Sequence, residues 1–374
     1  MSARRIVVAG LGAAGAAAAW RLARQGHHVI GLDRWRPPHS NGSSHGDTRV
    51  TRATAWEGAA YVPLAARAHE LWDELESVSS RKIRQRCGAL FIGEAQEEIV
   101  AETLRSAADS DVPVVEVDAS SAASRAPGLR LSPRSVVVED PGAGVLLLDD
   151  ALSAMLSTAA AAGADLRFDE PLLSWDARDS GVAVRTVRGE LEADALILAL
   201  GAWMPPMLAP LGLRLEIERQ TMHWFESASE EDEQRPVLIV TDGNDHATVI
   251  FPARNGLVKV AGHGSPDRVA RPEDVDREIH AADIAAVQET LDRWLPGRHG
   301  AHREAKTCLY TRTPSGHFIV DRHPEHAQVV LASPCNGFGF KFAPALGELV
   351  AAMVDGDESP LHWPGWRLAS AASS

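Results

Sequence analysis

The chain opens with two short apolar runs on either side of an alanine-rich segment. Residues 6–9 and 28–33 are short and mostly apolar, as in buried strands. Residues 13–24 between them have the composition and length of a helix. The order strand, helix, strand predicts the first unit of a doubly wound α/β domain.

Similar patterns recur along the chain. Helical periodicity covers residues 61–77, 147–162 and about 342–354. Asp149 and Asp150 favour the start of the second of these helices through the helix dipole. Strands are predicted at residues 164–168 and 182–187, followed by one apolar strand over 190–200 that runs into Gly201-Ala-Trp203.

Two segments, 86–139 and 216–304, have a different character. They contain strands such as 237–240 and 258–261, longer polar connections and one amphipathic helix at about 272–295. The predicted fold class is therefore α/β (α+β overall), a Rossmann-like domain with an inserted, sheet-based substrate domain. The dinucleotide-binding domain is expected over 1–85, 140–215 and 305–374, and the substrate domain over 86–139 and 216–304.

Composition excludes several classes of partner. Of 374 residues, 24% are charged and the net charge is −14, without a long block of either sign, which argues against nucleic acid or an anionic membrane. There is no apolar run of about 18 residues that could span a membrane. Arg4-Arg5 precedes an apolar stretch as in a signal peptide, but that stretch reads as a strand entering a glycine turn, so a cytoplasmic location is expected. The cysteines Cys87, Cys308 and Cys335 predict neither a disulfide framework nor a metal site.

The turn after the first strand reads Gly10-x-Gly12-x-x-Gly15. In a dinucleotide fingerprint the first glycine permits the tight turn, the second lets the backbone approach a pyrophosphate, and the third lets helix and strand pack closely. The helix N-terminus then offers free N–H groups to the phosphates. Asp33 ends the second strand, where an acidic side chain accepts ribose hydroxyls. An adenine dinucleotide is therefore predicted.

This fingerprint does not separate NAD from FAD. A flavoprotein that uses a pyridine nucleotide would carry a second fingerprint, but Gly142-Ala-Gly144 and Gly262-His-Gly264 lack the strand–turn–helix context. A flavin reduced directly by substrate is favoured, and an NAD-dependent Rossmann dehydrogenase remains the alternative.

Several separate motifs then point to one family. The chain resembles the monomeric sarcosine oxidase and N-methyltryptophan oxidase family, within the D-amino-acid-oxidase superfamily, over essentially its whole length. Besides the fingerprint, the resemblance rests on Gly42-Ser43-Ser44-His45-Gly-Asp-Thr-Arg49-x-x-Arg52, Tyr61-Val-Pro-Leu, Phe251-Pro252 through Lys259 to His263, Cys308-Leu-Tyr310-Thr311 and Gly337-Phe-Gly339-Phe-Lys341.

The resemblance implies FAD, attached covalently by a thioether from Cys308 to the 8α-methyl carbon of the flavin ring (8α-S-cysteinyl). The other residues expected to bind the cofactor are Gly10, Gly12, Gly15, Asp33, Arg34, Ser43, Ser44, Gly337 and Gly339.

It also implies roles on the substrate side. Arg52 and Lys341 are expected to bind a carboxylate, with Tyr310 lining the pocket. A reduced flavin carries negative charge that a cation or helix N-terminus can hold, and Lys341 precedes a helix. The expected catalytic residues are Lys259, which would promote reduction of O2, and His45, Arg49 and His263 around the flavin.

The chain also departs from the family. The family's tyrosine before the Phe-Pro pair is absent near Val249 or Ile250, and the loop after Arg52 reads Ala53-Thr-Ala-Trp56-Glu57-Gly58. The family's Ser-Gly-His before the lysine turn is replaced by Cys335-Asn-Gly337-Phe338. These differences leave the substrate open. We expect a monomeric, FAD-dependent oxidase of secondary or N-methyl amino acids that passes a hydride to flavin N5 and makes hydrogen peroxide from O2. Alternatives are an oxidase of a cyclic imino acid, a flavin dehydrogenase with another acceptor and a non-catalytic flavoprotein.

Overall fold

The computed structural model describes residues 2–241 and 247–371, and its first sheet is built around the N-terminal strand. β1 (Arg5–Ala9) pairs in parallel with both β2 (His28–Leu32) and β13 (Ala195–Leu198). Helix α1 (Ala13–Arg24) connects β1 to β2, which confirms the predicted strand–helix–strand unit. The full strand order of this sheet is β20 (Ile319–Arg322), β21 (Val329–Ser333), β13, β1, β2 and β9 (Asp165–Arg167).

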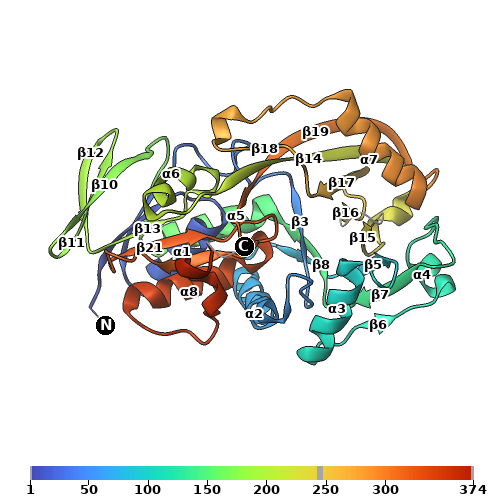
Figure 1. Cartoon of the computed structure of the whole chain (residues 1–374), viewed down its shortest axis with the longest axis horizontal. Helices are drawn as coiled ribbons and strands as arrows, with labels where there is room; N and C mark the ends of the chain where they lie inside the picture. Colours follow the sequence, from blue (N-terminus) through green and yellow to red (C-terminus); the bar gives the residue numbers. More distant parts are fainter. Residues whose placement is uncertain (1, 242–246, 372–374) are drawn as a thin grey trace.

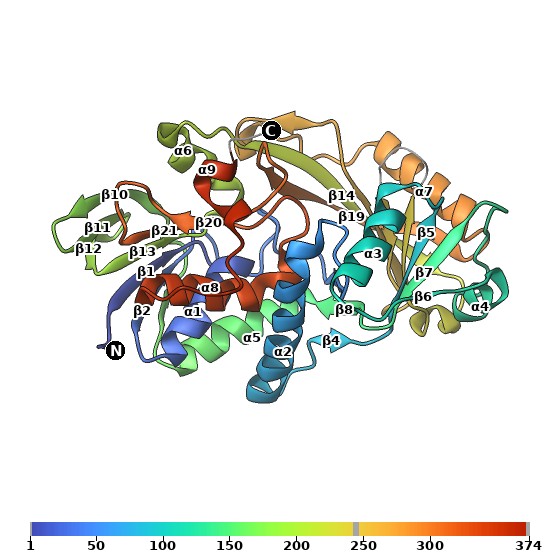
Figure 2. The same cartoon turned by 60° about the horizontal axis from the view of Figure 1, so that its bottom comes forward.

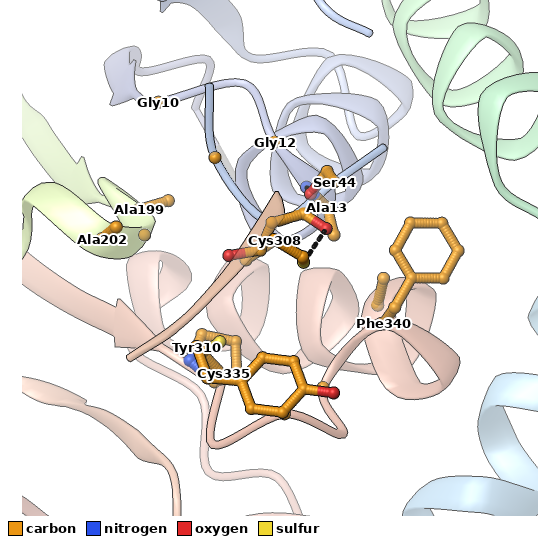
Figure 3. A pocket seen from close by; sticks show the side chains of 18 of the residues that line it. Gly10, Gly12, Ala13, Ser44, Ala199, Ala202, Cys308, Tyr310, Cys335 and Phe340 are labelled. Carbon is orange, nitrogen blue, oxygen red and sulfur yellow. Dashed lines mark hydrogen bonds between the residues drawn. The ribbon is translucent and has the colours of Figure 1, made fainter. Parts of the chain in front are cut away.

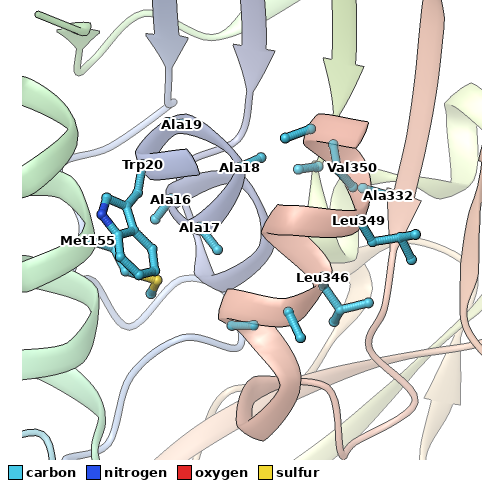
Figure 4. Close-up of a cluster of buried hydrophobic side chains, with 14 of the residues drawn as sticks. Ala16, Ala17, Ala18, Ala19, Trp20, Met155, Ala332, Leu346, Leu349 and Val350 are labelled. Carbon is cyan, nitrogen blue, oxygen red and sulfur yellow. The ribbon is translucent and has the colours of Figure 1, made fainter. Parts of the chain in front are cut away.

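Helices cover one face of this first sheet. Figure 4 shows α1 between α5 (Leu148–Ala161) and α8 (Ala343–Asp355). Helix α2 (Val62–Ser79) packs against both of these outer helices. Gly347 of α8 permits the close approach of α8 to α1, because a Cβ there would lie 2.5 Å from the backbone of Ala17. This close packing fixes the N-terminus of α1 at the end of β1.

A small antiparallel sheet covers the other face, formed by β10 (Leu172–Arg178), β11 (Gly181–Thr186) and β12 (Gly189–Ala193). The prediction of one strand over residues 190–200 was wrong, because β12 and β13 belong to different sheets. Asp194 separates them: its carboxylate accepts a hydrogen bond from the Arg5 N–H at 2.6 Å, and its own N–H donates to the Arg5 carbonyl at 2.8 Å. These bonds turn the chain from the exposed β12 into the buried β13.

A larger sheet forms the other end of the molecule (Figures 1 and 2). One of its faces carries α7 (Ala281–Trp294) and α4 (Ala119–Arg125), and the opposite face carries α3 (Glu98–Asp109). Its strand order is β18 (Arg268–Val269), β14 (Glu216–Ser227), β17 (Leu257–His263), β16 (Ala247–Ile250), β15 (Val237–Thr241), β5 (Ala89–Gly93), β7 (Val136–Asp140) and β6 (Val115–Glu116), with the long β19 (His299–Arg312) paired to β14.

The predicted amphipathic helix over residues 272–295 was too long at its N-terminal side. A short 3₁₀ turn covers Pro272–Asp274, and α7 begins only after His280, which forms a capping box with Asp283. Arg219 explains the interruption, since its guanidinium binds the carbonyls of Asp276 and Glu278 at 2.8 and 2.6 Å. Those carbonyls therefore accept from a side chain instead of continuing a helix.

A third, small sheet lies between the two large ones, in the order β3 (Thr48–Thr51), β8 (Gly144–Leu147), β4 (Arg84–Gln85). The segment 216–304 supplies β14 to β18 and the start of β19, so the predicted domain boundary at residue 305 falls within β19. Short helices α6 (Pro205–Leu208) and α9 (Leu368–Ala371) complete the elements shown in Figures 1 and 2. In the part of the chain that the structure describes, every helix is too short or too polar to cross a membrane.

Candidate active site

A cavity of about 470 Å³ lies between the first sheet and the larger sheet. Its lining joins the turn after β1 to residues of β17, β19 and the loop before α8. Predicted site residues that line it are Gly10, Gly12, Asp33, Arg34, Ser43, Ser44, Arg49, Arg52, Lys259, His263, Cys308, Tyr310, Gly337, Gly339 and Lys341. The predicted site residues Gly15 and His45 are not among the residues that line the cavity.

The glycine turn at one end has the steric design that the fingerprint predicts. Gly10 has a φ of +91°, and a Cβ there would meet the Ala199 carbonyl oxygen at 2.3 Å. A Cβ on Gly15 would meet the Gly10 carbonyl oxygen at 1.7 Å, so this glycine allows α1 to pack against the turn. At Gly12 the nearest atom would be Ser44 Oγ at 3.2 Å, which leaves the backbone open to the cavity.

Asp33 and Ser44 hold this turn in place. Asp33 Oδ2 accepts from the Leu11 N–H at 2.7 Å, and Oδ1 accepts from the Trp35 N–H at 2.9 Å. Ser44 Oγ accepts from the Ala13 N–H at 3.0 Å, in the first turn of α1. The arrangement leaves a carboxylate and free helix N–H groups at one end of the cavity, which suits an adenosine diphosphate group.

Two indole rings flank this end and were only partly anticipated from the sequence. The ring centroids of Trp35 and Trp203 lie 5.0 Å apart, and the Arg34 guanidinium lies 5.4 Å from each of them. All three residues line the cavity. They give it a cationic and aromatic wall beside Asp33.

Cys308 lies between the Gly12–Ser44 end of the cavity and the pair Tyr310 and Cys335 (Figure 3). Its side chain is buried, and its Sγ lies 3.8 Å from Arg49 Nη2 and 3.7 Å from the Ser43 carbonyl oxygen. Burial raises the pKa of the Cys308 thiol, while the positive charges of Arg49 and Lys259 oppose that shift. A cysteine beside two cations can form a thiolate more readily than burial alone would allow.

Arg49 and Lys259 are both fixed by backbone carbonyls. Arg49 donates to the carbonyls of Thr48 and Ser43 at 2.8 and 2.7 Å. Lys259 Nζ donates to the carbonyls of Gly46 and Thr48 at 2.6 and 2.7 Å, and the side chain is only 4% exposed. The lysine on β17 therefore points inward, into the cavity wall. Burial and Arg49 lower the pKa of Lys259 well below its ordinary value.

Arg52 and Lys341 meet at a buried carboxylate that the sequence reasoning did not assign. Glu57 Oε1 accepts from Arg52 Nη2 at 2.5 Å and from Lys341 Nζ at 2.9 Å. Burial alone would raise the pKa of Glu57, but the two cations lower it to about 2. Burial and Arg52 lower the pKa of Lys341 to about 7, although Glu57 opposes this. The sequence offered one indication of this ion pair, namely an acidic residue, Glu57, a few positions after Arg52.

One guanidinium nitrogen in this cluster has no protein partner. Arg52 is 2% exposed, and its Nη1 is buried without a hydrogen bond although the residue lines the cavity. The guanidinium carbon lies 3.6 Å from the centroid of the Trp56 ring. A buried donor without a partner costs free energy unless a ligand or water accepts a hydrogen bond from it, so this nitrogen is available to an incoming anion.

Uncharged side chains form the wall beside this anion site. His263 Nδ1 lies 3.3 Å from the Tyr310 hydroxyl, and burial followed by Arg312 lowers the pKa of His263 to about 4, so its ring is neutral at neutral pH. Gly337 has a φ of +91°, and a Cβ there would lie 2.5 Å from the Tyr310 ring. Trp56 and Val249 complete the wall.

His45 and Cys335 are a further histidine and a further cysteine of the candidate site. His45 is buried with both ring nitrogens unpartnered, and burial followed by Arg49 and Lys259 lowers its pKa to about 3. Cys335 lines the cavity, and its Sγ accepts from the Thr311 N–H at 3.3 Å. Within residues 2–241 and 247–371, no group of His, Cys, Asp and Glu side chains is placed to hold a metal ion.

Residues 5–353 match the family model described as FAD dependent oxidoreductase. The chain belongs to this family. Its sequence is 36% identical to a monomeric sarcosine oxidase from Streptomyces avermitilis, with 93% of each chain covered. It is 33% identical to one from a Bacillus species, with 93% of this chain and 91% of that protein covered. An N-methyl-L-tryptophan oxidase from Yersinia pestis is 29% identical, with 97% and 98% covered.

Solved structures agree on the fold of this FAD-dependent oxidoreductase. NikD, described as an unusual amino acid oxidase essential for nikkomycin biosynthesis, has a TM-score of 0.85 at 22% identity, with 98% of each chain covered. Glycine oxidase from Geobacillus kaustophilus has a TM-score of 0.82 at 20% identity, with 98% of each chain covered. These findings confirm the predicted D-amino-acid-oxidase fold type.

The residues present fit FAD. The Gly10–Gly15 turn forms a cradle that β-carbons would fill, and Asp33 faces the cavity beside it. The cationic residues Arg49, Lys259 and Lys341 lie toward the other end, where an isoalloxazine ring would accept negative charge. When bound, the flavin supplies the acceptor for a hydride or an electron pair.

Proposed function

We propose that this protein is an oxidase of secondary or N-methyl amino acids that uses O2 as its electron acceptor. The observation that carries the proposal is the buried Arg52–Glu57–Lys341 cluster, in which Arg52 Nη1 has no hydrogen-bond partner. Arg52 and Lys341 line the same cavity as Cys308 and Lys259. The curated relatives named above add support, since their names state oxidation of N-methyl amino acids.

The charge of the cluster suits a monocarboxylate. Arg52 and protonated Lys341 carry two positive charges and Glu57 one negative charge, which leaves one positive charge for the ligand. A guanidinium N–H and an ammonium N–H on the same side bind a carboxylate and fix its orientation. The neutral His263 and Tyr310 then face the amine nitrogen and the carbon next to it.

No general base is assigned to the oxidation. Glu57 binds two cations, and Lys259 and Arg49 are held by carbonyls. The neutral His263 ring lies beside the Tyr310 hydroxyl. A substrate that binds as the neutral amine needs no proton removed before hydride transfer. The resulting imine would hydrolyse in water.

We also propose that Cys308 is the covalent attachment point of the flavin. Cys308 lines the cavity, and its sulfur lies beside Arg49. The positive charges of Arg49 and Lys259 both lower the pKa of the thiol and so favour the thiolate. Cys335 lines the same cavity, but its sulfur accepts a hydrogen bond from the Thr311 N–H instead of from Arg49, so it is the matched control cysteine.

Lys259 is the residue proposed to promote reaction with O2. A fixed positive charge beside the flavin lowers the barrier for electron transfer to O2, because the product of the first step is an anion. Its burial makes the charge effective, since little water screens it. The two sarcosine oxidases named above are described as monomeric, and we propose the same state for this chain.

The side-chain pocket favours substrates larger than sarcosine. Val249 leaves space where the family's tyrosine would stand, and Trp56 offers an indole face next to the carboxylate site. N-methylated amino acids with flat or bulky side chains fit these features best. A cyclic imino acid is the second candidate, because Val249 leaves room for a ring.

A peroxide-coupled assay over N-methyl and cyclic amino acids tests the proposal, with their decarboxylated amines as matched controls. We expect turnover only with the carboxylates. The flavin should stay attached after acid precipitation of the wild type and of Cys335→Ser, and should be released from Cys308→Ser. Reduction of the flavin without peroxide formation would indicate another electron acceptor, and absence of reduction by every amino acid would refute the oxidase assignment.

A further inference from the structure

A second cavity of about 290 Å³ lies on the other side of Lys259 from the candidate active site. Lys259 and Phe251 line both cavities, so the lysine side chain forms part of the partition between them. The mouth of the second cavity is formed by exposed residues, among them Arg254 and Asn255, and its floor by Thr48 and Trp224, which are buried.

The floor of this cavity carries polar atoms that the protein leaves unpartnered. Thr48 Oγ1 is buried without a hydrogen-bond partner, and the residue is 6% exposed. Asp149 Oδ1, in the first turn of α5, is likewise buried and unpartnered. Buried polar atoms that line a cavity of this size are typically satisfied by water. A chain of water molecules from the mouth to Lys259 would satisfy both atoms.

The charges around Lys259 divide between the two sides. Arg49 on β3 and Cys308 on β19 face it from the active site, and Arg49 opposes its positive charge. Asp47 and Asp149 line the second cavity and favour the positive charge. His45 and Lys306 complete the charged and titratable surroundings, and Lys306 also interacts with both aspartates.

Reduction of O2 to hydrogen peroxide consumes two electrons and two protons. Flavin reduced by a hydride supplies both electrons and the N5 proton, so the second proton must come from the protein or from solvent. The Lys259 nitrogen is held by the carbonyls of Gly46 and Thr48, with the Phe251 ring 4.9 Å and the Trp224 ring 5.6 Å from it. Thr48 and Trp224 both line the second cavity. The second cavity offers a polar approach to it.

We propose that the second cavity is the route by which water and protons reach Lys259, and that Asp149 is a positioning residue that keeps this lysine charged. The proposal rests on the proposed function in one respect, the role of Lys259 in O2 reduction. Burial and Asp47 raise the pKa of Asp149, which suits a carboxyl group that exchanges protons with the water beside it.

Carbamylation of Lys259 by cyanate, mapped by mass spectrometry on the FAD-loaded enzyme, tests the route without using turnover. Cyanate is small and reacts with the uncharged amine. We expect Lys259 to be modified in the wild type and at least about tenfold more slowly in Leu257→Trp, which fills the cavity from its rim. Arg254→Trp is a second filling variant, and Val187→Trp, on an exposed side chain far from the cavity lining, is the control.

The variant Asp149→Asn tests whether Asp149 keeps Lys259 charged. Loss of the carboxylate should lower the pKa of Lys259 further, so that the lysine reacts several-fold faster with cyanate and begins to react at lower pH. Its rate constant for reoxidation by O2 should fall, while anaerobic reduction by substrate stays unchanged. Asp150→Asn is the matched control, because that side chain is 41% exposed and lies 3.5 Å from Arg81.

The outcomes separate this proposal from the proposed function. An unmodified Lys259 in the wild type, or equal rates in the wild type and both filling variants, would overturn the route. An unchanged pH dependence of carbamylation in Asp149→Asn would overturn the role of Asp149. If both expectations hold but Lys259→Met reoxidises at the wild-type rate, the route stands and the oxygen role of Lys259 is wrong.

Discussion

The two ends of the active-site cavity are built in different ways. The dinucleotide end comes mainly from one continuous stretch, β1 to β2, and its shape depends on backbone packing around Gly10 and Gly15. The carboxylate end joins Arg52, Glu57 and Lys341 from distant parts of the chain and depends on buried charge. The first end is therefore sensitive to atoms added at Gly10 and Gly15, whereas the second is sensitive to the removal of a buried charge.

The largest effect is expected from Gly15→Ala at the dinucleotide end. The new Cβ would meet the Gly10 carbonyl oxygen at 1.7 Å, so α1 must move away from the turn. We expect a loss of about 3 kcal/mol in the free energy of unfolding, together with loss of FAD. Denaturant unfolding and the visible absorbance of the purified protein measure both. Gly262→Ala, where an added Cβ meets no protein atom within 4 Å although the residue lines the cavity, is the control for stability and should unfold at the wild-type denaturant concentration.

A smaller loss is expected from Glu57→Gln at the carboxylate end. The variant leaves Arg52 and Lys341 buried without an anion, which should cost about 3 kcal/mol or somewhat less, because Lys341 can release its proton. Added acetate should restore more stability to this variant than to the wild type, since it can replace the missing charge. Thermal unfolding with and without acetate measures this, and equal acetate shifts would contradict the charge-balance explanation.

The smallest effect is a pH dependence of carboxylate binding. Lys341 has a lowered pKa of about 7, so it is protonated below that pH and loses its charge above it. The Kd for acetate should therefore rise with pH above about 7, by up to tenfold per unit. Isothermal titration from pH 6 to 9 measures this. In Lys341→Met the Kd should be weak and independent of pH, and a wild-type Kd that is flat over this range would contradict the prediction.

The same contrast explains what the sequence could predict. Dinucleotide binding depends on neighbours in the chain, so β1, α1 and β2 were predicted at nearly the observed positions, and the family comparison confirms the FAD-dependent fold. The helix over 272–295 was overestimated because Arg219, more than fifty positions away, binds its first carbonyls. Apolar periodicity carries no information about such a contact.

The carboxylate end was predicted only through resemblance. Arg52 and Lys341 were named, and they do lie together, but Glu57 between them was not assigned. Its position depends on how the loop folds back after Arg52, where Gly58 has a φ of +121°. Local propensity does not specify such a path, and a buried ion cluster requires the whole fold to be known. The catalytic roles of these residues remain predictions.

The long ladder between β14 and β19 has a mechanical consequence. Cys308 belongs to a strand that is hydrogen-bonded to the larger sheet through Gln220 and its neighbours, whereas the dinucleotide cradle belongs to the first sheet. With a thioether at Cys308, the cofactor would be bound covalently to the larger sheet and noncovalently to the cradle of the first sheet. Because a tethered flavin cannot diffuse away on unfolding, rebinding to the cradle would be intramolecular, so the heat resistance of the holoenzyme should not depend on the concentration of free FAD.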